Sequence, residues 1–431
     1  AHSKTDGINA IQNPKNANFF ADDDGYQNNS ISLNLSQNLS AQHTIGVRVL
    51  IAEGENQFDG AAYDANFSPV AQNYDYRNDT QNGAFSVWSK HQLLENLTTE
   101  LQVGRGIDKS DSYAPRSPAN YADKISTFDI NQDQASLHNT LKLADGSVTF
   151  GAELLNQELS STTTYPVEKR RINSFLAGYV GQYQGINLQA NLRNDDNSQY
   201  GNETTYGVGL STALTDKISV GAQHSTAFLA PSFNDLYFPF YGNDQLAPEE
   251  SSSRELFAQL TLDELSSRLT VYQNDVKNLI QYNPATFGPS NIGQARLQGI
   301  TLNNDWQLDN LQAGVSYDYL DAEDQSSAAT RGKQLRYRAK HSGVAYFGMQ
   351  QEQSSGRVEL QAVGERYTSA SNTEQVAGYT LVNLSGGFQV SPELKLGLRV
   401  NNLFDEQYES IKDYGTLGTN GLLSLTYTPK L

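Results

Sequence analysis

Three acidic runs in the first fifth of the chain carry the residue types that bind hard divalent cations. They are Ala21-Asp22-Asp23-Asp24-Gly25-Tyr26, Gln57-Phe58-Asp59-Gly60 and Asn73-Tyr74-Asp75-Tyr76. Calcium binds about six to eight oxygen ligands, mainly carboxylates and carbonyls, and flexible loops supply such ligands well. The runs are compatible with a calcium site that draws on two loops. Spacing alone favours a second interpretation, in which these residues are ordinary solvated aspartates.

The remaining reactive side chains do not form a catalytic arrangement. The six histidines are scattered without metal-binding spacing: His2, His43, His91, His138, His224 and His341. The chain has no cysteine and no Gly-x-Ser-x-Gly nucleophile motif. The acidic pairs Asp195-Asp196 and Glu249-Glu250 would point to opposite faces of a strand, because side chains alternate. The sequence therefore predicts a protein that is not an enzyme.

Composition limits both the partners and the compartment. A net charge of −18 at pH 7 would repel phosphates, which excludes nucleic acid as a partner. The mean hydropathy is −0.56, and no apolar run reaches the ~18 residues of a transmembrane helix. A transmembrane barrel stays possible, because only every second residue of its strands faces lipid. The chain begins with Ala1 and shows no signal peptide, so we expect a processed or truncated chain.

Strict alternation of apolar and polar residues dominates the sequence. Clear rows are Ile31, Leu33 and Leu35; Ile45, Val47, Val49 and Ile51; Val148, Phe150, Ala152 and Leu154; Leu394, Leu396, Leu398 and Val400; and Leu423, Leu425 and Tyr427. A period of two predicts strands with one apolar face, and we count roughly 20 of them. Polar residues on the second face, such as Arg48, Gln189 and Glu359, are typical of a wet lumen rather than a packed core.

The connections between these strands are of two kinds. Tight turns are expected at 40–42, 94–96, 145–146, 184–185, 215–216, 309–310 and 391–393, and long polar loops at 10–28, 54–80, 107–127, 229–250, 281–294, 321–334 and 405–418. Short periplasmic turns and long extracellular loops are typical of outer-membrane barrels, whereas a soluble β-sandwich would not sort its connections this way. The sequence therefore predicts an all-β fold, an antiparallel transmembrane β-barrel. We expect a monomer in contact with outer-membrane lipid and lipopolysaccharide.

A long aromatic segment, residues 228–256, separates two of the predicted strands. Three prolines rule out a continuous helix or a central strand: Pro231, Pro239 and Pro248. We therefore expect a long loop that either folds over something or binds something.

The same segment carries a family resemblance. Ala-Phe-Leu-Ala-Pro-Ser at 227–232 and Asn-Asp-Gln-Leu-Ala-Pro-Glu at 243–249 resemble the paired motif of TonB-dependent outer-membrane receptors. Leu229 and Asp244 depart from that motif, where the family has Arg and often Pro. Asn401-Asn402-Leu403-Phe404-Asp405-Glu406-Gln407-Tyr408 resembles the segment before the family's last strand.

Within this family the resemblance is closest to the cobalamin receptors and covers nearly the whole chain. It implies TonB-dependent uptake of cobalamin or a related corrinoid, with calcium ordering two extracellular loops. The metal ligands that it implies are Asp6, Asp22, Asp24, Asp59 and Asp75, and the substrate contacts are Phe58, Arg338 and Tyr414. Residues 1–431 would then be a truncated barrel domain without the plug, through which TonB acts, and without the first strands.

Three other functions are compatible with parts of this pattern. They are a receptor for a siderophore or another metal chelate, a passive porin-like channel, and a soluble β-rich binding protein. The C-terminal Leu431 also departs from the Phe or Trp that usually ends such barrels.

Overall fold

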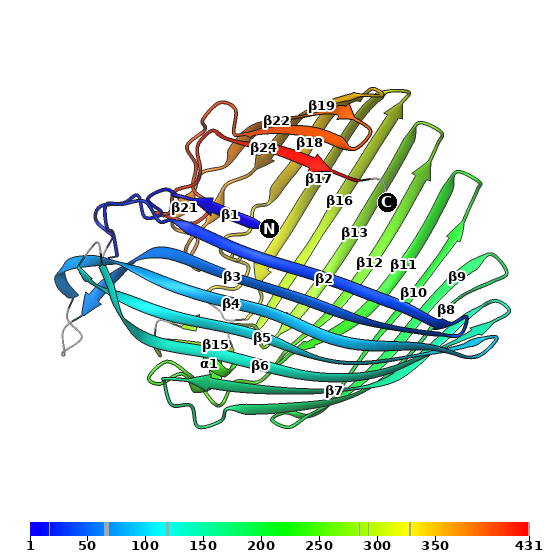
Figure 1. Cartoon of the computed structure of the whole chain (residues 1–431), viewed down its shortest axis with the longest axis horizontal. Helices are drawn as coiled ribbons and strands as arrows, with labels where there is room; N and C mark the ends of the chain where they lie inside the picture. Colours follow the sequence, from blue (N-terminus) through cyan, green and yellow to red (C-terminus); the bar gives the residue numbers. More distant parts are fainter. Residues whose placement is uncertain are drawn as a thin grey trace. The chain divides into compact units, whose positions relative to one another are not determined.

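The computed structural model describes residues 1–16, 18–63, 69–117, 120–283, 285–291, 293–326 and 329–429, almost entirely as strands (Figure 1). The strands are β1 (His2–Thr5), β2 (Tyr26–Ser40), β3 (His43–Tyr63), β4 (Pro69–Leu94), β5 (Leu97–Ser117), β6 (Asn120–Leu143), β7 (Gly146–Ser161), β8 (Lys169–Tyr183), β9 (Ile186–Asn197), β10 (Gly201–Ala213), β11 (Ile218–Leu229), β12 (Glu249–Thr261), β13 (Leu265–Lys277), β14 (Ile280–Asn283), β15 (Gly288–Asn291), β16 (Gln294–Leu308), β17 (Leu311–Asp324), β18 (His341–Gln350), β19 (Ser354–Val363), β20 (Arg366–Tyr367), β21 (Gln375–Val376), β22 (Tyr379–Ser391), β23 (Leu394–Asn401) and β24 (Asn420–Tyr427). One helix, α1 (Phe233–Tyr237), interrupts them. Among the described residues, no helix has the length and apolar character needed to cross a bilayer.

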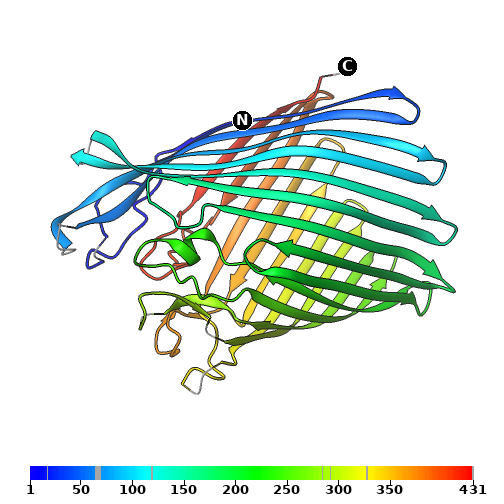
Figure 2. The same cartoon turned by 90° about the horizontal axis from the view of Figure 1, so that it is seen from below.

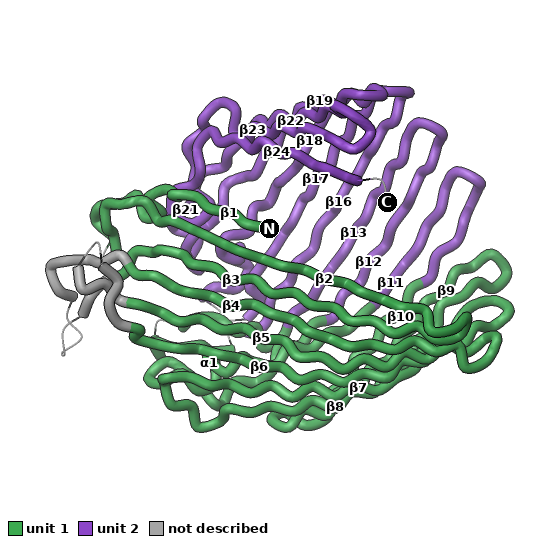
Figure 3. The backbone as a smooth tube through the Cα atoms, viewed as in Figure 1, with its two compact units in different colours: residues 1–209, 225–251, 277–292 green, residues 210–224, 252–276, 293–431 purple. Residues whose placement is uncertain are grey.

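The chain divides into two compact units, coloured separately in Figure 3. Unit 1 comprises Ala1–Gly209, Ser225–Ser251 and Lys277–Ile292, and unit 2 comprises Leu210–His224, Ser252–Val276 and Gly293–Leu431. Twenty strands share one sheet, which agrees with the predicted number, and β14–β15 and β20–β21 form separate two-stranded sheets.

Unit 1 is built on an antiparallel meander in which each strand from β1 to β9 pairs with the next. The register places Ile31 opposite Ile51 and Val47 opposite Val87, so the apolar rows share one face. A slip of one residue would turn every one of these side chains to the other face. In Figure 2 the tight turns that follow β2, β4, β6 and β8 lie at one end of these strands, as the sequence predicted.

Unit 2 repeats the same construction. The strands β16, β17, β18, β19, β22, β23 and β24 pair in that order, each antiparallel to its neighbour. Ile300 lies opposite Tyr319, and Val315 lies opposite Ala345, which again aligns one apolar face.

The apolar rows are exposed rather than packed into a core. Ile31 is 71% exposed and Leu423 is 75% exposed, although both are large aliphatic side chains. The alternate residues form polar contacts instead, such as the hydrogen bond that Arg48 donates to Gln102 (3.1 Å). A soluble protein rarely leaves such rows uncovered, and this two-faced pattern is typical of strands with a lipid face and a wet face.

Two predicted loops are strands in the described residues. The segments 54–80 and 107–127 continue β3 to β6, with Gly54 opposite Thr80 and Ser112 opposite Ser126. Their composition is polar, and the prediction relied on apolar alternation. Ladder hydrogen bonds between backbone groups do not require apolar side chains, so these strands extend beyond the apolar band.

Candidate functional site

The first candidate site lies where the segment between β1 and β2 turns back on itself in unit 1. The backbone N–H of Asp24 donates to the carbonyl of Ile8 (3.0 Å), and the Asp24 carboxylate accepts the N–H of Ala10 (2.8 Å). Gly7 has a φ of 80°, and a Cβ there would lie 1.8 Å from the Asp24 carbonyl oxygen. Only glycine fits this close approach, so Gly7 allows the segment to close around Asp24.

A carboxylate of β3 joins this segment. Asp59 Oδ2 accepts the backbone N–H of Phe20 (3.2 Å), and the Asn9 amide donates to the Phe20 carbonyl (3.0 Å). These contacts bring Asp22, Asp24 and Asp59 into one region with Asn9. We call these four residues the carboxylate cluster.

Each member of the carboxylate cluster has a buried oxygen atom without a partner among the described residues. These atoms are Asn9 Oδ1, Asp22 Oδ1, Asp24 Oδ1 and Asp59 Oδ1. A buried polar atom without a hydrogen bond is costly, and four such acceptors in one place are chemically suited to a cation.

Burial, with added repulsion from neighbouring aspartates, disfavours the charged forms of the three carboxylates. Burial raises the pKa of Asp59 to about 6, against the N–H bond from Phe20 that lowers it, and the charges of Asp24 and Asp22 raise it further. Burial also raises the pKa of Asp22, with added repulsion from Asp24 and Asp23. The pKa of Asp24 is likewise raised, mainly by burial. The backbone N–H groups of Ala10 and Phe20 thus offset the charge of Asp24 and Asp59 only in part.

The donor types fit calcium, because carboxylate and amide oxygens are its usual ligands. The present spacing is not a finished coordination sphere: among the described residues, no three His, Asp or Glu side chains converge closely enough to hold a metal ion. The chemistry of the donors thus supports a cation site, and binding would have to draw the carboxylates together.

The other predicted metal ligands lie around this cluster. Asp6 is exposed and precedes Gly7, without a described contact to the carboxylates. Asp75 lies opposite Asp59 in the β3–β4 ladder, and its side chain falls outside the described part of the structure. Sequence reasoning missed Asn9, because a single amide in a polar segment carries no recognisable spacing.

The aromatic segment 228–256 folds onto the strand ends of unit 1. Helix α1 begins with a capping box between Ser232 and Asp235 and buries Phe233 and Leu236. Phe233 packs in a small core with Leu159 and Tyr165, together with Phe128, Ile130 and Tyr237. The prediction of a loop that folds over something is therefore confirmed, with the addition of one short helix.

Arg170 of β8 holds this segment in place. Its guanidinium lies over the ring of Phe233 (5.1 Å) and donates to the carbonyl of Pro231 (2.7 Å). Tyr165 adds a hydrogen bond from its hydroxyl to Asn234 (2.6 Å). A buried cation with these partners gives the segment a defined position.

Two neighbouring loop tips present aromatic side chains to solvent. Tyr241 stacks on Tyr282, with ring centroids 6.5 Å apart and an interplanar angle of 7°. Phe240 and Phe287 are highly exposed, and their backbones adopt φ values of 63° and 52°. Such conformations are uncommon for bulky residues and mark positions that deserve a functional explanation. We call these four residues the aromatic platform.

Amide side chains tie the two tips of the aromatic platform together. Asn243 donates to the carbonyl of Pro289 (3.2 Å), while Asn291 accepts the N–H of Ala247 (2.8 Å) and donates to its carbonyl (2.9 Å). These hydrogen bonds connect the two loop tips at the base of the aromatic platform. Sequence reasoning noted aromatic residues in the first tip and missed their partners in the second.

The predicted substrate residues are distributed over both units. Phe58 in unit 1 stacks on Tyr76 of β4 (5.6 Å). Arg338 and Tyr414 in unit 2 are exposed, and the N–H of Tyr414 donates to Ile411 (3.1 Å). Phe58 is half-buried, whereas Arg338 and Tyr414 are exposed.

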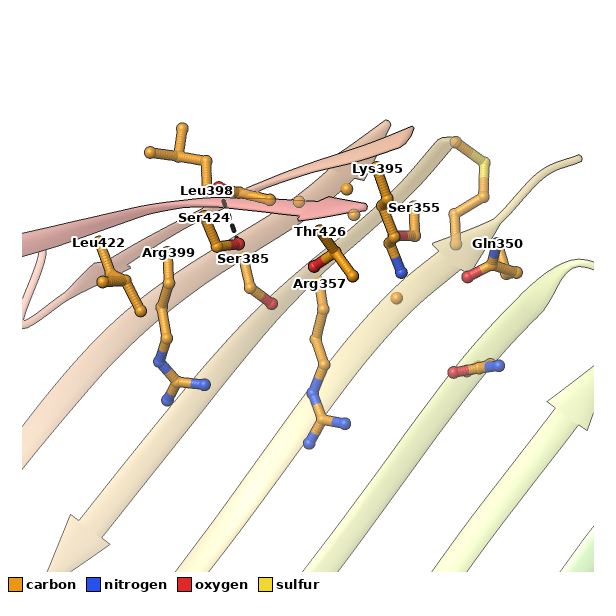
Figure 4. Close-up of a pocket in the computed structure, with 17 residues that line it drawn as sticks. Gln350, Ser355, Arg357, Ser385, Lys395, Leu398, Arg399, Leu422, Ser424 and Thr426 are labelled. Atoms are coloured by element: carbon orange, nitrogen blue, oxygen red, sulfur yellow. Dashed lines mark hydrogen bonds between the residues drawn. The ribbon is translucent and has the colours of Figure 1, made fainter. Parts of the chain in front are cut away.

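The polar face of unit 2 has a hollow of about 430 Å³ along β18 to β24 (Figure 4). Arg357 and Arg399 point into it in the same direction, and both lie near Glu359, at 3.1 Å and 3.6 Å. Glycines form much of its wall: Gly348, Gly356, Gly386, Gly387 and Gly397. The hollow is a charged part of the polar face of unit 2, and none of the predicted substrate residues lines it.

Comparison with known proteins decides the family. The profile described as "TonB dependent receptor-like, beta-barrel" matches residues 3–403. The chain belongs to this family. Family members are outer-membrane receptors and transporters, which agrees with the exposed apolar rows and the 20-stranded sheet.

Sequence relatives include two vitamin B12 transporters. The BtuB protein of Photobacterium profundum is 29% identical over 98% of this chain and 67% of its own length. That of Vibrio vulnificus is 28% identical over 83% of this chain and 59% of its own length. The chain therefore spans about two thirds or less of these relatives.

Solved structures share the fold. A ferric enterobactin receptor of Pseudomonas aeruginosa covers 97% of this chain, with a TM-score of 0.78 and 18% identity, and 72% of that chain is matched. The copper transporter OprC covers 99%, with a TM-score of 0.80 and 13% identity, and 74% of it is matched.

Proposed function

We propose that this chain forms the wall of an outer-membrane transporter for cobalamin or a related corrinoid. The observation that carries the proposal is the match to a vitamin B12 transporter over 98% of the chain. TonB would supply the energy through a plug, which we assign to the part of the relatives' length that this chain does not span. The exposed apolar rows support an outer-membrane location.

Calcium would order the extracellular end of unit 1. Asp22, Asp24, Asp59 and Asn9 would supply oxygen ligands from the carboxylate cluster, with Asp75 and Asp6 as further ligands. A bound cation offsets repulsion among the buried carboxylates. It also coordinates the oxygen atoms that have no hydrogen-bond partner. The segment between β1 and β2 would then be held firmly against β3.

The aromatic platform and the predicted substrate residues would contact the corrinoid. A corrinoid is large and amphipathic, and aromatic side chains offer large contact surfaces at low cost in conformational entropy. Tyr241 and Tyr282 would provide a flat stacking surface, while Phe58, Arg338 and Tyr414 would contribute from other loops.

The decisive experiment measures cobalamin binding to the detergent-purified chain with calcium and with a chelator. We expect binding that depends on calcium and is lost in the double variant Asp22→Asn/Asp24→Asn. The matched control is Asp216→Asn, because Asp216 is an exposed aspartate in the tight turn that precedes β11. Calcium-dependent binding that persists in the double variant would remove the calcium site from the proposal.

The same preparation separates the rival functions. Binding of a ferric siderophore in preference to cobalamin would replace the corrinoid with a metal chelate. Steady conductance in planar bilayers without TonB would instead indicate a passive channel. A chain that stays dispersed in buffer without detergent would contradict the outer-membrane location itself.

A further inference from the structure

The hollow on the polar face of unit 2 is lined by three cationic side chains. These are Arg357, Arg399 and Lys395, and no Asp or Glu belongs to the described residues that line it. The chain as a whole carries a net charge of −18. The hollow therefore attracts anions, which an acidic surface repels.

The strand register places the three cations around a row of small residues. Arg357 lies opposite Ser385, and Ser385 lies opposite Arg399, so the two arginines share one row across β19, β22 and β23. The next row towards the tight turns consists of Ser355, Gly387, Gly397 and Ser424. Lys395 lies in the row beyond, opposite Thr426. The hollow thus opens over serine and glycine, between two guanidinium groups and one ammonium group.

Two glycines keep this row open. A Cβ at Gly397 would lie 2.5 Å from Ser424 Oγ. A Cβ at Gly387 would lie 2.9 Å from Ser355 Oγ. Ser424 donates only a long hydrogen bond, 3.4 Å, to the carbonyl of Gly397 (Figure 4). Both hydroxyls line the hollow and are able to donate to an oxyanion.

The nearest carboxylate offsets only one of the three positive charges. Glu359 lies 3.1 Å from Arg357 and 3.6 Å from Arg399. Its side chain is 22% exposed, whereas those of the two arginines are 40% and 48% exposed. Lys395 is exposed and forms no ion pair with a described residue. Both guanidinium groups and the ammonium group therefore remain accessible to a ligand.

Three further carboxylates lie around the hollow without lining it. Asp305 accepts the hydroxyl of Tyr346 (2.8 Å), and Arg357 lies over the ring of Tyr346 (3.6 Å). Glu352 and Glu393 belong to the turns that precede β19 and β23. The space between the arginine row and the lysine row is therefore bounded by donors rather than by carboxylates.

We propose that this hollow binds the phosphate group of a small organic solute. Arg357 and Arg399 bind phosphate oxygens through their planar donors, and Lys395 contributes a third charged contact. A phosphate has oxygens in several directions, so cations from separate strands can each contact one. The hollow of about 430 Å³ falls within the ~300–1,000 Å³ of small-molecule sites, so it has room for an organic substituent. The inference does not depend on which ligand the aromatic platform binds.

Isothermal titration of the detergent-purified chain with glycerol 3-phosphate tests the proposal. The buffer contains no phosphate, and calcium and chelator are dialysed away, so that calcium at the carboxylate cluster cannot bind the ligand. We expect saturable binding that inorganic phosphate competes for and glycerol does not. Arg399→Gln and Lys395→Gln should each weaken binding about tenfold, the loss expected for one hydrogen bond to a charged group.

The matched control is Arg48→Gln, which removes a cation from the polar face of unit 1, where Arg48 donates to Gln102 (3.1 Å). Arg48, Lys395 and Arg399 are all exposed, so the three variants should unfold at the temperature of the unchanged chain. Arg48→Gln should bind glycerol 3-phosphate normally. Binding that does not saturate, an equal loss in Arg48→Gln, or unchanged affinity in Lys395→Gln and Arg399→Gln would overturn the proposed site. Binding of inorganic phosphate with exclusion of glycerol 3-phosphate would overturn the assignment to an organic phosphate.

Discussion

Protons and calcium should compete for the carboxylate cluster, and Asp59 sets the pH range. Its pKa of about 6 means that roughly 97% of this carboxyl is ionised at pH 7.5 and roughly 9% at pH 5. Calcium binds the ionised form, so the apparent affinity should fall about tenfold over this interval from Asp59 alone. The raised pKa values of Asp22 and Asp24 act in the same direction.

Without calcium, the pH trend should reverse. The folded-state pKa of Asp59 lies above its ordinary value of 3.8, so the folded segment holds its proton more tightly than the unfolded chain does. This contribution to stability is complete below pH 3.8 and is lost as the pH rises through about 6. The calcium-free segment 6–25 should therefore be less protected at pH 7.5 than at pH 5, and calcium should restore its protection at pH 7.5.

Isothermal titration with calcium and hydrogen exchange of residues 6–25 measure the two trends. Asp59→Asn removes the titrating group while keeping its shape, so the pH dependence should shrink and calcium should bind at least about tenfold more weakly. Asp216→Asn again serves as the control. Equal calcium affinity at pH 5 and pH 7.5, or wild-type affinity in Asp59→Asn, would refute the reasoning.

Three further substitutions test how the loops are held. Gly7→Ala places a Cβ 1.8 Å from the Asp24 carbonyl and strains a positive φ, which should open the segment by ~1–3 kcal/mol and abolish calcium protection in hydrogen exchange. Ser232→Ala removes the cap of α1 and should destabilise it by about 1 kcal/mol, seen as faster exchange in residues 230–238 only. Arg170→Gln removes the donor to Pro231 and should increase protease cleavage within 228–256, while the thermal unfolding of the strands stays unchanged. Uniform destabilisation of the whole chain would contradict the last two predictions.

The strand architecture could be predicted because it depends on local pattern. Alternation in rows such as Ile31 to Leu35 specifies which face is apolar, and the tight turns specify which ends meet. The prediction was wrong about the described parts of 54–80 and 107–127, which are strands. In these segments the backbone ladder continues without an apolar face. The apolar–polar alternation from which strands were predicted is therefore absent.

The carboxylate cluster could be predicted only in part. Asp22, Asp24 and Asp59 stand in acidic runs that the sequence shows, and the family resemblance named them as metal ligands. Which carboxylates meet, and the participation of Asn9, follow from the return of residues 6–25 onto β2 and β3, a contact between positions far apart in the chain.

The sequence by itself determined the fold class, the number of strands and the two-faced character of each strand, because side chains of a strand alternate regardless of what surrounds it. Only the tertiary structure decided which polar atoms are buried without partners and how α1 packs on the strand ends. Those features depend on the register between strands and on loop closure at residues such as Gly7. Neither is encoded in the periodicity of a single segment.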